Sequence, residues 1–513
     1  MTIFRSSTFV CTFLAVLPLS AAITDPVQVE QGTVSSVAGS SADVRVFKGI
    51  PFAAPPVGDL RWRAPKAPAS WTGTRGGDKF GPVCTQRRAP NAQGEMSEDC
   101  LYLNVYTAAK NARAHEPVMV WIHGGAFTSG AGSLYDGEAL AKKGVVVVTV
   151  NYRLGVFGFL AHPALTKESD FKASGNYALL DQIAALEWVR KNIAAFGGDP
   201  KKVTIFGESA GSWSVNYMMA TPLAKGLFER AIGESGGEFA PARKLSDAEK
   251  AGERFAQSTG ADSIAALRAK TPEELMRVAG FQAAANVDGW LLPADVYTIF
   301  SQGKQSDVPL LIGSNNDEGT MFTPPGVKAA AFRATAEQRF KSDADAFLKL
   351  YPFSNDQEAW AAQAASMRDQ TFGWEMRTWA RMQTKTGKSK VYMYYFNHVP
   401  PGKNRSHGAY HGSEIPYAFG NLEIAPFAVN GNSETPVFQD VDRALANAMS
   451  WYWVNFATTG DPNGKGLTKW PAYRAKDDTV MGLGDKIAVE PLPNKPALDF
   501  LDTYFEHQRG AER

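Results

Sequence analysis

The chain has 513 residues, of which 44% are hydrophobic, so it is large enough to bury an extensive core. Its 53 lysines and arginines nearly balance its 52 aspartates and glutamates, giving a formal net charge of +1, and the basic residues do not cluster. Proteins that bind nucleic acid normally carry a basic patch, so this composition argues against nucleic acid as a partner.

The first 22 residues have the pattern of a signal peptide. Arg5 precedes an apolar stretch over residues 9–19, and residues 20–22 are small, as a cleavage site requires. The apolar stretch is too short to cross a bilayer. We therefore expect residues 1–22 to direct export and to be removed, which predicts a secreted or periplasmic protein.

The remainder of the chain shows no internal division. No repeat, low-complexity linker or long charge run interrupts it, so we expect residues 23–513 to form one large domain with long insertions. No later apolar run has transmembrane length. Cys84 and Cys100 are an even pair in an exported chain, which predicts a disulfide. Neither has a histidine at ligand spacing, so we expect no metal site.

Several short apolar runs predict strands of one sheet, and a helix over residues 177–192 is predicted from apolar residues at helical spacing. Buried strands that alternate with helices predict an α/β fold, with a large, mostly parallel twisted sheet and helices on both faces. Ligands bind beyond the carboxyl ends of such strands, so the residues after each strand carry the most information. The predicted strands are residues 118–122, 145–150, 203–206, 308–312 and 391–396.

The first of these strands is followed by a loop of small residues, His123-Gly124-Gly125-Ala126-Phe127. Small residues let backbone N–H groups approach a substrate closely. Acyl transfer needs such donors, because its tetrahedral intermediate develops an oxyanion. We therefore expect this loop to supply part of an oxyanion hole.

The strand at 203–206 leads into Gly207-Glu208-Ser209-Ala210-Gly211, a Gly-x-Ser-x-Gly sequence between a strand and a helix. In this motif the serine occupies a strained turn that exposes its hydroxyl above the sheet. A Cβ at Gly207 or Gly211 would collide with the neighbouring strand or helix. The pattern predicts that Ser209 is a nucleophile and that the N–H of Ala210 is an oxyanion donor.

A serine nucleophile needs an imidazole base, and that base needs a carboxylate to orient it. In this kind of sheet the chain order is serine, acid, histidine. Asp317 and Glu318 follow the strand at 308–312, and His407 and His411 follow the strand at 391–396. The spacing leaves both acids and both histidines open as candidates.

At this point the chain resembles the type-B carboxylesterase family, which includes the cholinesterases and has the α/β-hydrolase fold. The resemblance covers nearly the whole chain after residue 22. It rests on residues 47–58 (FKGIPFAAPPVG), 97–104 (SEDCLYLN), 151–155 (NYRLG), 207–211 (GESAG) and 459–463 (TGDPN).

The resemblance implies a role for each residue that matches the family's pattern. The acid would be Glu318 and the base His411, completing a triad with Ser209. The implied oxyanion donors are Gly125, Ala126 and Ala210, with Gly124 as the turn residue of the loop. The disulfide would be Cys84–Cys100, a buried polar network would comprise Glu208, Ser235 and Glu414, and structural ion pairs would be Arg61–Glu98 and Arg153–Asp181.

The chain also departs from the cholinesterases. In those proteins a tryptophan inside the first disulfide loop binds quaternary ammonium by cation–π attraction. Residues 85–99 of this chain contain no aromatic residue, which argues against choline esters as substrates. Ala126 stands where many relatives have a third glycine, and members with such a loop are associated with bulky alcohols.

The sequence therefore predicts a serine hydrolase that acts on small-molecule carboxylic esters through an acyl-enzyme and needs no cofactor. Two alternatives are a specialised esterase, for an aromatic ester, a polyester or a toxin, and a non-catalytic adhesion protein of the same fold. The latter would usually lack a triad residue. Candidate residues lining the substrate pocket are Phe127, Trp213, Trp290, Phe322 and Trp374.

Overall fold

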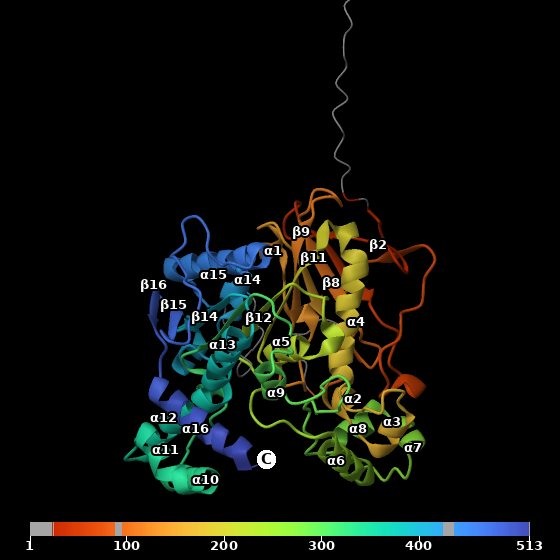
Figure 1. The fold of residues 1–513 in the computed structure, drawn as a ribbon. Coiled ribbons are helices and arrows are strands. Elements are labelled where there is room, and N and C mark those ends of the chain that lie inside the picture. Colours follow the sequence, from red (N-terminus) through yellow and green to blue (C-terminus); the bar gives the residue numbers. More distant parts are fainter. Residues whose placement is uncertain (1–22, 24, 88–94, 424–435, 512–513) are drawn as a thin grey trace, which may run out of the picture.

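The computed structural model describes residues 23, 25–87, 95–423 and 436–511 (Figure 1). The predicted signal peptide, residues 1–22, lies outside the described residues. Within the part of the chain that is described, no helix combines the length and the apolar character needed to cross a bilayer.

The fold is organised around one sheet of eleven strands in the order β16-β15-β14-β13-β12-β11-β9-β10-β8-β4-β3. The seven strands from β15 to β10 in this order are parallel, and both edges are antiparallel. The predicted class, a mostly parallel α/β sheet, is confirmed. The bounds are β3 Val37–Ala38, β4 Arg45–Pro51, β8 Tyr102–Thr107, β9 Glu116–Ile122, β10 Val146–Val150, β11 Gly198–Glu208, β12 Arg230–Glu234, β13 Leu310–Asn315, β14 Val391–Phe396, β15 Thr479–Leu483 and β16 Ile487–Pro491.

Both faces of the sheet are buried, as its apolar strands require. In β9, Val118 and Val120 belong to the core cluster on one face, and Met119 and Trp121 to the cluster on the other. The first cluster includes residues of α4 (Tyr177–Asn192), α5 (Ala210–Ala220) and α13 (Trp374–Thr386). The second includes residues of α1 (Glu138–Ala141), α14 (Ile415–Phe419) and α15 (Asp440–Thr459).

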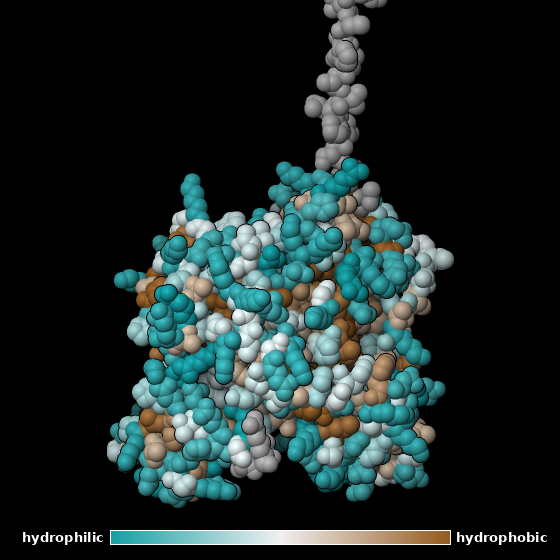
Figure 2. Space-filling view, in the orientation of Figure 1, coloured by the Kyte–Doolittle hydropathy of each residue, from teal (hydrophilic) through white to brown (hydrophobic). Residues whose placement is uncertain are grey.

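Two further groups of helices lie at one end of the molecule (Figure 1). One is α6 (Leu245–Ser258), α7 (Ile264–Arg268) and α8 (Pro272–Arg277); the other is α10 (Ala329–Phe340), α11 (Ala344–Leu350) and α12 (Asp356–Arg368). Each packs around a separate small apolar cluster, to which residues outside the group also contribute. Figure 2 shows mostly hydrophilic residues over both groups and a notch in the molecular outline between them.

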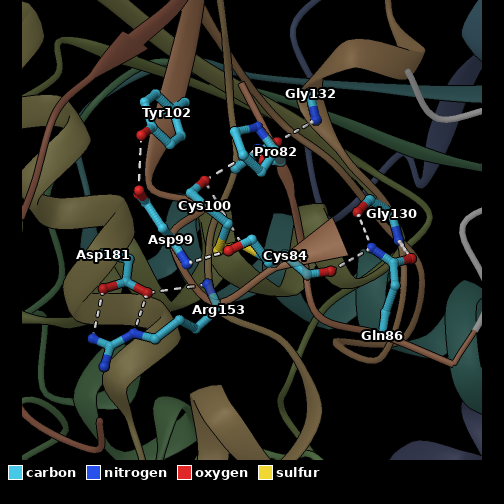
Figure 3. The surroundings of a disulfide bond; sticks show 12 residues. Pro82, Cys84, Gln86, Asp99, Cys100, Tyr102, Gly130, Gly132, Arg153 and Asp181 are labelled. Atoms are coloured by element: carbon cyan, nitrogen blue, oxygen red, sulfur yellow. Dashed lines mark hydrogen bonds and ion pairs between the residues drawn. A yellow bond between two sulfur atoms is a disulfide. The ribbon is translucent and has the colours of Figure 1, made fainter. Parts of the chain in front are cut away.

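The predicted disulfide is present between Cys84 and Cys100 (Figure 3). Asn151 Nδ2 donates to the carbonyl oxygens of Pro82 (3.0 Å) and Cys100 (3.2 Å), and Gln86 Nε2 donates to those of Cys84 and Gly130 (2.9 Å each). Cross-linking a loop of this length stabilises a fold by about 3 kcal/mol in the chain-entropy model. The disulfide segment is thus tied to the residues just after the loop at 123–127.

Two buried ion pairs hold the same region together. Arg153 forms a bidentate pair with Asp181, with Nη2–Oδ1 at 2.7 Å and Nε–Oδ2 at 2.8 Å (Figure 3). Arg61 forms a second bidentate pair with Glu98. Because all four side chains are largely enclosed, removing one partner would leave a buried charge, at a typical cost of about 3–5 kcal/mol.

Candidate active site

Ser209 lies at the sharp turn from β11 to α5. Its backbone has φ 56° and ψ −122°, a strained conformation for a residue other than glycine. A Cβ at Gly211 would lie 2.0 Å from the carbonyl oxygen of Ile122 on β9, and one at Gly207 would lie 2.6 Å from the same oxygen. The turn therefore depends on both glycines, and it places Ser209 at the carboxyl end of the sheet.

His411 and Glu318 meet in the loops beyond β14 and β13. His411 Nδ1 lies 2.5 Å from Glu318 Oε2, and the other carboxylate oxygen, Oε1, accepts the N–H of Asn315 at 2.8 Å. Both side chains are buried. This contact fixes the ring of His411 and directs its Nε2 edge away from Glu318.

The Nε2 atom of His411 faces the turn that carries the serine. It lies 3.2 Å from Oε1 of Glu208, the residue before Ser209. Burial alone would lower the pKa of His411, but the carboxylates of Glu208, Glu318 and Glu414 outweigh burial and raise it to about 9. The imidazolium is therefore strongly stabilised at this site.

Two more buried carboxylates belong to this cluster of acidic residues. Glu414 Oε2 accepts a hydrogen bond from Asn315 Nδ2 (2.5 Å), and Glu414 Oε1 accepts one from Ser235 Oγ (3.4 Å). Burial, with the nearby Glu318, raises the pKa of Glu414 to about 7. Glu234, at the end of β12, accepts a hydrogen bond from Trp453 Nε1 at 2.8 Å, and burial raises its pKa well above the usual range. The sequence analysis did not identify Glu234 or Asn315.

The two other candidates from the sequence, Asp317 and His407, make hydrogen bonds between the loops. Asp317 Oδ2 accepts the N–H of Ala409 at 2.8 Å, and the backbone N–H of Asp317 donates to the carbonyl of Ala409 at 3.0 Å. The carbonyl of His407 accepts a hydrogen bond from Thr320 Oγ1 at 2.9 Å. These contacts join the two loops that carry Glu318 and His411.

The loop after β9 has an irregular backbone. Gly125, Ala126 and Phe127 all have positive φ, at 102°, 52° and 58°. A Cβ at Gly124 would lie 2.7 Å from the carbonyl oxygen of Glu208, so this glycine packs directly against the serine turn. Ala210 is the first residue of α5, where a helix has no internal partner for its N–H.

His123 at the start of this loop is part of its support. Its ring stacks on Tyr152 with centroids 4.3 Å apart, and the Tyr152 hydroxyl donates to the carbonyl of His123 at 2.6 Å. Burial lowers the pKa of His123 to about 4, against a smaller opposing effect of its contact with the Gly124 carbonyl. His123 is therefore neutral at physiological pH.

The aromatic candidates fall into different environments. Phe322 is 47% exposed and its ring lies 5.0 Å from that of His411; Phe372, which the sequence analysis missed, lies 4.7 Å from His411. Trp213 is partly exposed one turn after Ser209. Trp374 is 1% exposed and stacks on Phe505, so the expectation that it lines a pocket is wrong. Two candidates remain. Phe127 is buried, with its ring centroid 5.8 Å from that of Trp213, and the ring of Trp290 stacks on that of Phe171.

Comparison with known proteins identifies the class. A strained serine turn, a buried histidine–carboxylate contact and a loop of small residues lie together at the carboxyl end of an α/β sheet. The model of the carboxylesterase family matches residues 24–501. The chain belongs to this family, and it is an enzyme that hydrolyses carboxylic esters.

The relatives support this class over nearly their full length. The fumonisin B1 esterase of Sphingopyxis macrogoltabida is 39% identical over 502 residues, covering 93% of this chain and 91% of that protein. The para-nitrobenzyl esterase of Bacillus subtilis (strain 168) is 37% identical, covering 88% and 93%. Among solved structures, a thermophilic pNB esterase superposes with a TM-score of 0.81 at 35% identity, covering 93% of this chain and 99% of that one.

Proposed function

We propose that the enzyme cleaves small-molecule carboxylic esters through an acyl-enzyme on Ser209. His411 takes the proton of the Ser209 hydroxyl as it attacks the ester carbonyl, and Glu318 orients the ring and stabilises the imidazolium. His411 then protonates the leaving alcohol, and water repeats the sequence to release the acid. The backbone N–H groups of Gly125, Ala126 and Ala210 hold the oxyanion, and Gly124 allows the loop its close approach.

The observation that carries this proposal is the 2.5 Å contact between His411 Nδ1 and Glu318 Oε2, buried beside the strained Ser209 turn. A carboxylate on Nδ1 selects the tautomer in which Nε2 is the base. Nε2 faces the end of β11, where Ser209 directly precedes α5. The surrounding network of Glu208, Ser235 and Glu414 stabilises the positive charge that forms on the ring.

The Cys84–Cys100 disulfide supports the further proposal that the enzyme is exported to the periplasm or secreted. Disulfides persist in oxidising compartments and are rare in the cytosol. The segment predicted to direct export, residues 1–22, precedes the fold.

A more specialised substrate is the second candidate. The 39% identity to a fumonisin B1 esterase is the observation that favours this candidate. Incubating the enzyme with fumonisin B1 and following free acid by mass spectrometry tests it. Release of acid at a rate comparable to that for a simple ester would support the specialised role. No release of acid from fumonisin B1 would exclude that role and favour the general one.

A chain-length series tests the general function. Purified enzyme is assayed with p-nitrophenyl esters from acetate to decanoate. We expect turnover with an optimum at one acyl length, because a pocket of fixed depth gains apolar contact only until it is filled. Folded protein that cleaves neither these esters nor fumonisin B1 would contradict the assignment and favour the non-catalytic alternative.

The pH dependence should report the charge of Glu208. His411 must be neutral to act as a base, so kcat/KM rises with pH through the pKa of His411, which is about 9. Burial raises the pKa of Glu208 itself well above its usual range, and once ionised Glu208 raises the pKa of His411 by stabilising the imidazolium. Glu208→Gln should therefore move the rising limb of kcat/KM to lower pH by about one unit.

The control for this experiment is Glu273→Gln, which removes an exposed carboxylate on α8 and should leave the profile in place. A rising limb at the same pH in Glu208→Gln and in the unchanged enzyme would show that Glu208 does not act on the base.

A further inference from the structure

A second acidic position lies in the segment that follows Ser235, beside α5. Gly236 packs against the serine turn: its carbonyl accepts a hydrogen bond from Ser212 Oγ at 2.5 Å, and a Cβ there would lie 2.5 Å from the carbonyl oxygen of Ser209 and 3.1 Å from the ring of Trp213. Two residues later comes Glu238, whose N–H donates to Asn216 Oδ1 of α5 at 3.1 Å.

The face of α5 next to this segment opens to solvent at one place. Trp213 is partly exposed, whereas every other residue of α5 is buried. Tyr217 follows Trp213 by four residues, so the two side chains share a helix face. Tyr217 is eight residues after Ser209, which is about 12 Å along the helix axis. Trp213 therefore lies between Ser209 and Tyr217 along the helix.

Glu238 lies beside Tyr217, because its carboxylate accepts a hydrogen bond from the Tyr217 hydroxyl. The side chain is partly exposed, yet burial raises its pKa to about 7, with the Tyr217 hydrogen bond opposing the rise. Glu238 therefore combines partial exposure of the residue with a carboxyl group that the protein strongly desolvates.

The other charged groups around the segment are already engaged. Glu375 on α13 accepts the N–H of Phe239 at 2.6 Å, and Arg509 on α16 (Lys495–Ala511) donates to the carbonyl of Phe239. The guanidinium of Arg509 also lies 3.6 Å above the ring of Tyr297 on α9 (Val296–Ser301). Figure 1 shows α9 next to α5, with α13 nearby. Of these groups, Glu238 is the acid left to meet a ligand.

We propose that Glu238, in the segment that packs beside the serine turn and Trp213, is a specificity-determining residue whose carboxylate favours esters carrying a cationic group about six bonds from the reacting carbonyl. This rests on the proposed role of Ser209. It concerns a position distinct from residues 85–99, where the cholinesterase tryptophan is missing.

The test uses pairs of esters that differ only in charge. On the acyl side, p-nitrophenyl 6-(trimethylammonio)hexanoate is compared with p-nitrophenyl 7,7-dimethyloctanoate; on the alcohol side, 3-(trimethylammonio)propyl butyrate is compared with 4,4-dimethylpentyl butyrate. In each pair a tert-butyl carbon replaces the quaternary nitrogen. The quaternary cation does not titrate. A change with pH in the ratio of kcat/KM for the charged ester to kcat/KM for the neutral ester therefore reflects a titrating group of the protein.

We expect that ratio to rise about tenfold between pH 6 and pH 8 for at least one pair, because a carboxyl with a pKa near 7 goes from about 10% to about 90% ionised over this range. Glu238→Gln should abolish the rise, and Glu273→Gln should keep it. A ratio that is flat with pH in both pairs, or that rises equally in Glu238→Gln, would overturn the proposal.

A second variant guards against a folding defect in Glu238→Gln. Tyr217→Phe keeps the carboxylate but removes the hydrogen bond that favours its ionised form, so the midpoint of the rise should move to higher pH. An unchanged midpoint would overturn the proposal. If the neutral esters are not hydrolysed at all, the proposed function has failed, and calorimetric binding of the corresponding methyl ketones applies the same comparison to Glu238 without turnover.

Discussion

Replacing Ser209 by alanine should lower kcat for p-nitrophenyl butyrate about 10⁶-fold, the size of effect found when the nucleophile of a serine triad is removed. The reason is that no other group stands at the turn where β11 meets α5 to form the acyl-enzyme. The rest of the site remains, so some acceleration over water should persist from the oxyanion donors. The measurement is steady-state turnover with purified protein.

The variant should fold normally, because alanine keeps the Cβ that already occupies this strained position. Ser258→Ala, at an exposed serine on α6, is the matched control and should retain full turnover. Ester hydrolysis by Ser209→Ala within tenfold of the unchanged enzyme, with an unaltered unfolding temperature, would exclude Ser209 as the nucleophile.

Removing the base should have an effect of similar size. His411→Ala should lower kcat about 10⁵- to 10⁶-fold, since the nucleophile and its base act as one unit. His407→Ala is an unusually close control: it is four residues away in the same loop, and its fold contact is made by its backbone carbonyl, which alanine retains. We expect His407→Ala to keep most of the activity. Loss in His407→Ala with turnover retained in His411→Ala would reverse the assignment.

The sequence predicted the parts of the site that depend on steric constraint. Gly207 and Gly211 were expected to have no room for a Cβ, and the nearest backbone oxygen would lie 2.6 Å and 2.0 Å away. The strands at 118–122 and 391–396 lie within or match the observed β9 and β14. Such features follow from local composition and spacing, because the motif and the strand are each a few residues long.

The sequence was less informative about where side chains point and about which distant residues meet in the fold. Spacing could not separate Asp317 from Glu318, because adjacent side chains point to different places: one binds the N–H of Ala409 and the other contacts His411. The central strand β12 was missed, because its run of Arg230–Glu234 is short and contains a glycine. With it the buried Glu234 was missed.

The carboxylate cluster around His411 illustrates the same limit. Glu208, Glu318 and Glu414 come from three segments that are far apart in the chain, and their combined effect on the pKa of His411 depends on burial and distance. The resemblance to the family named these residues, but only the fold brings their charges to one ring. Trp374 shows the opposite error, since its aromatic ring supports α16 rather than a pocket.

The central claim is that Ser209 becomes acylated, and covalent trapping tests it most directly. The enzyme is treated with diethyl p-nitrophenyl phosphate, which phosphorylates activated serine nucleophiles, and the labelled residue is located by peptide mass spectrometry. We predict one phosphoryl group per chain, on Ser209, with loss of esterase activity in proportion to labelling. Complete labelling at another residue, or full activity after Ser209 is labelled, would contradict the mechanism.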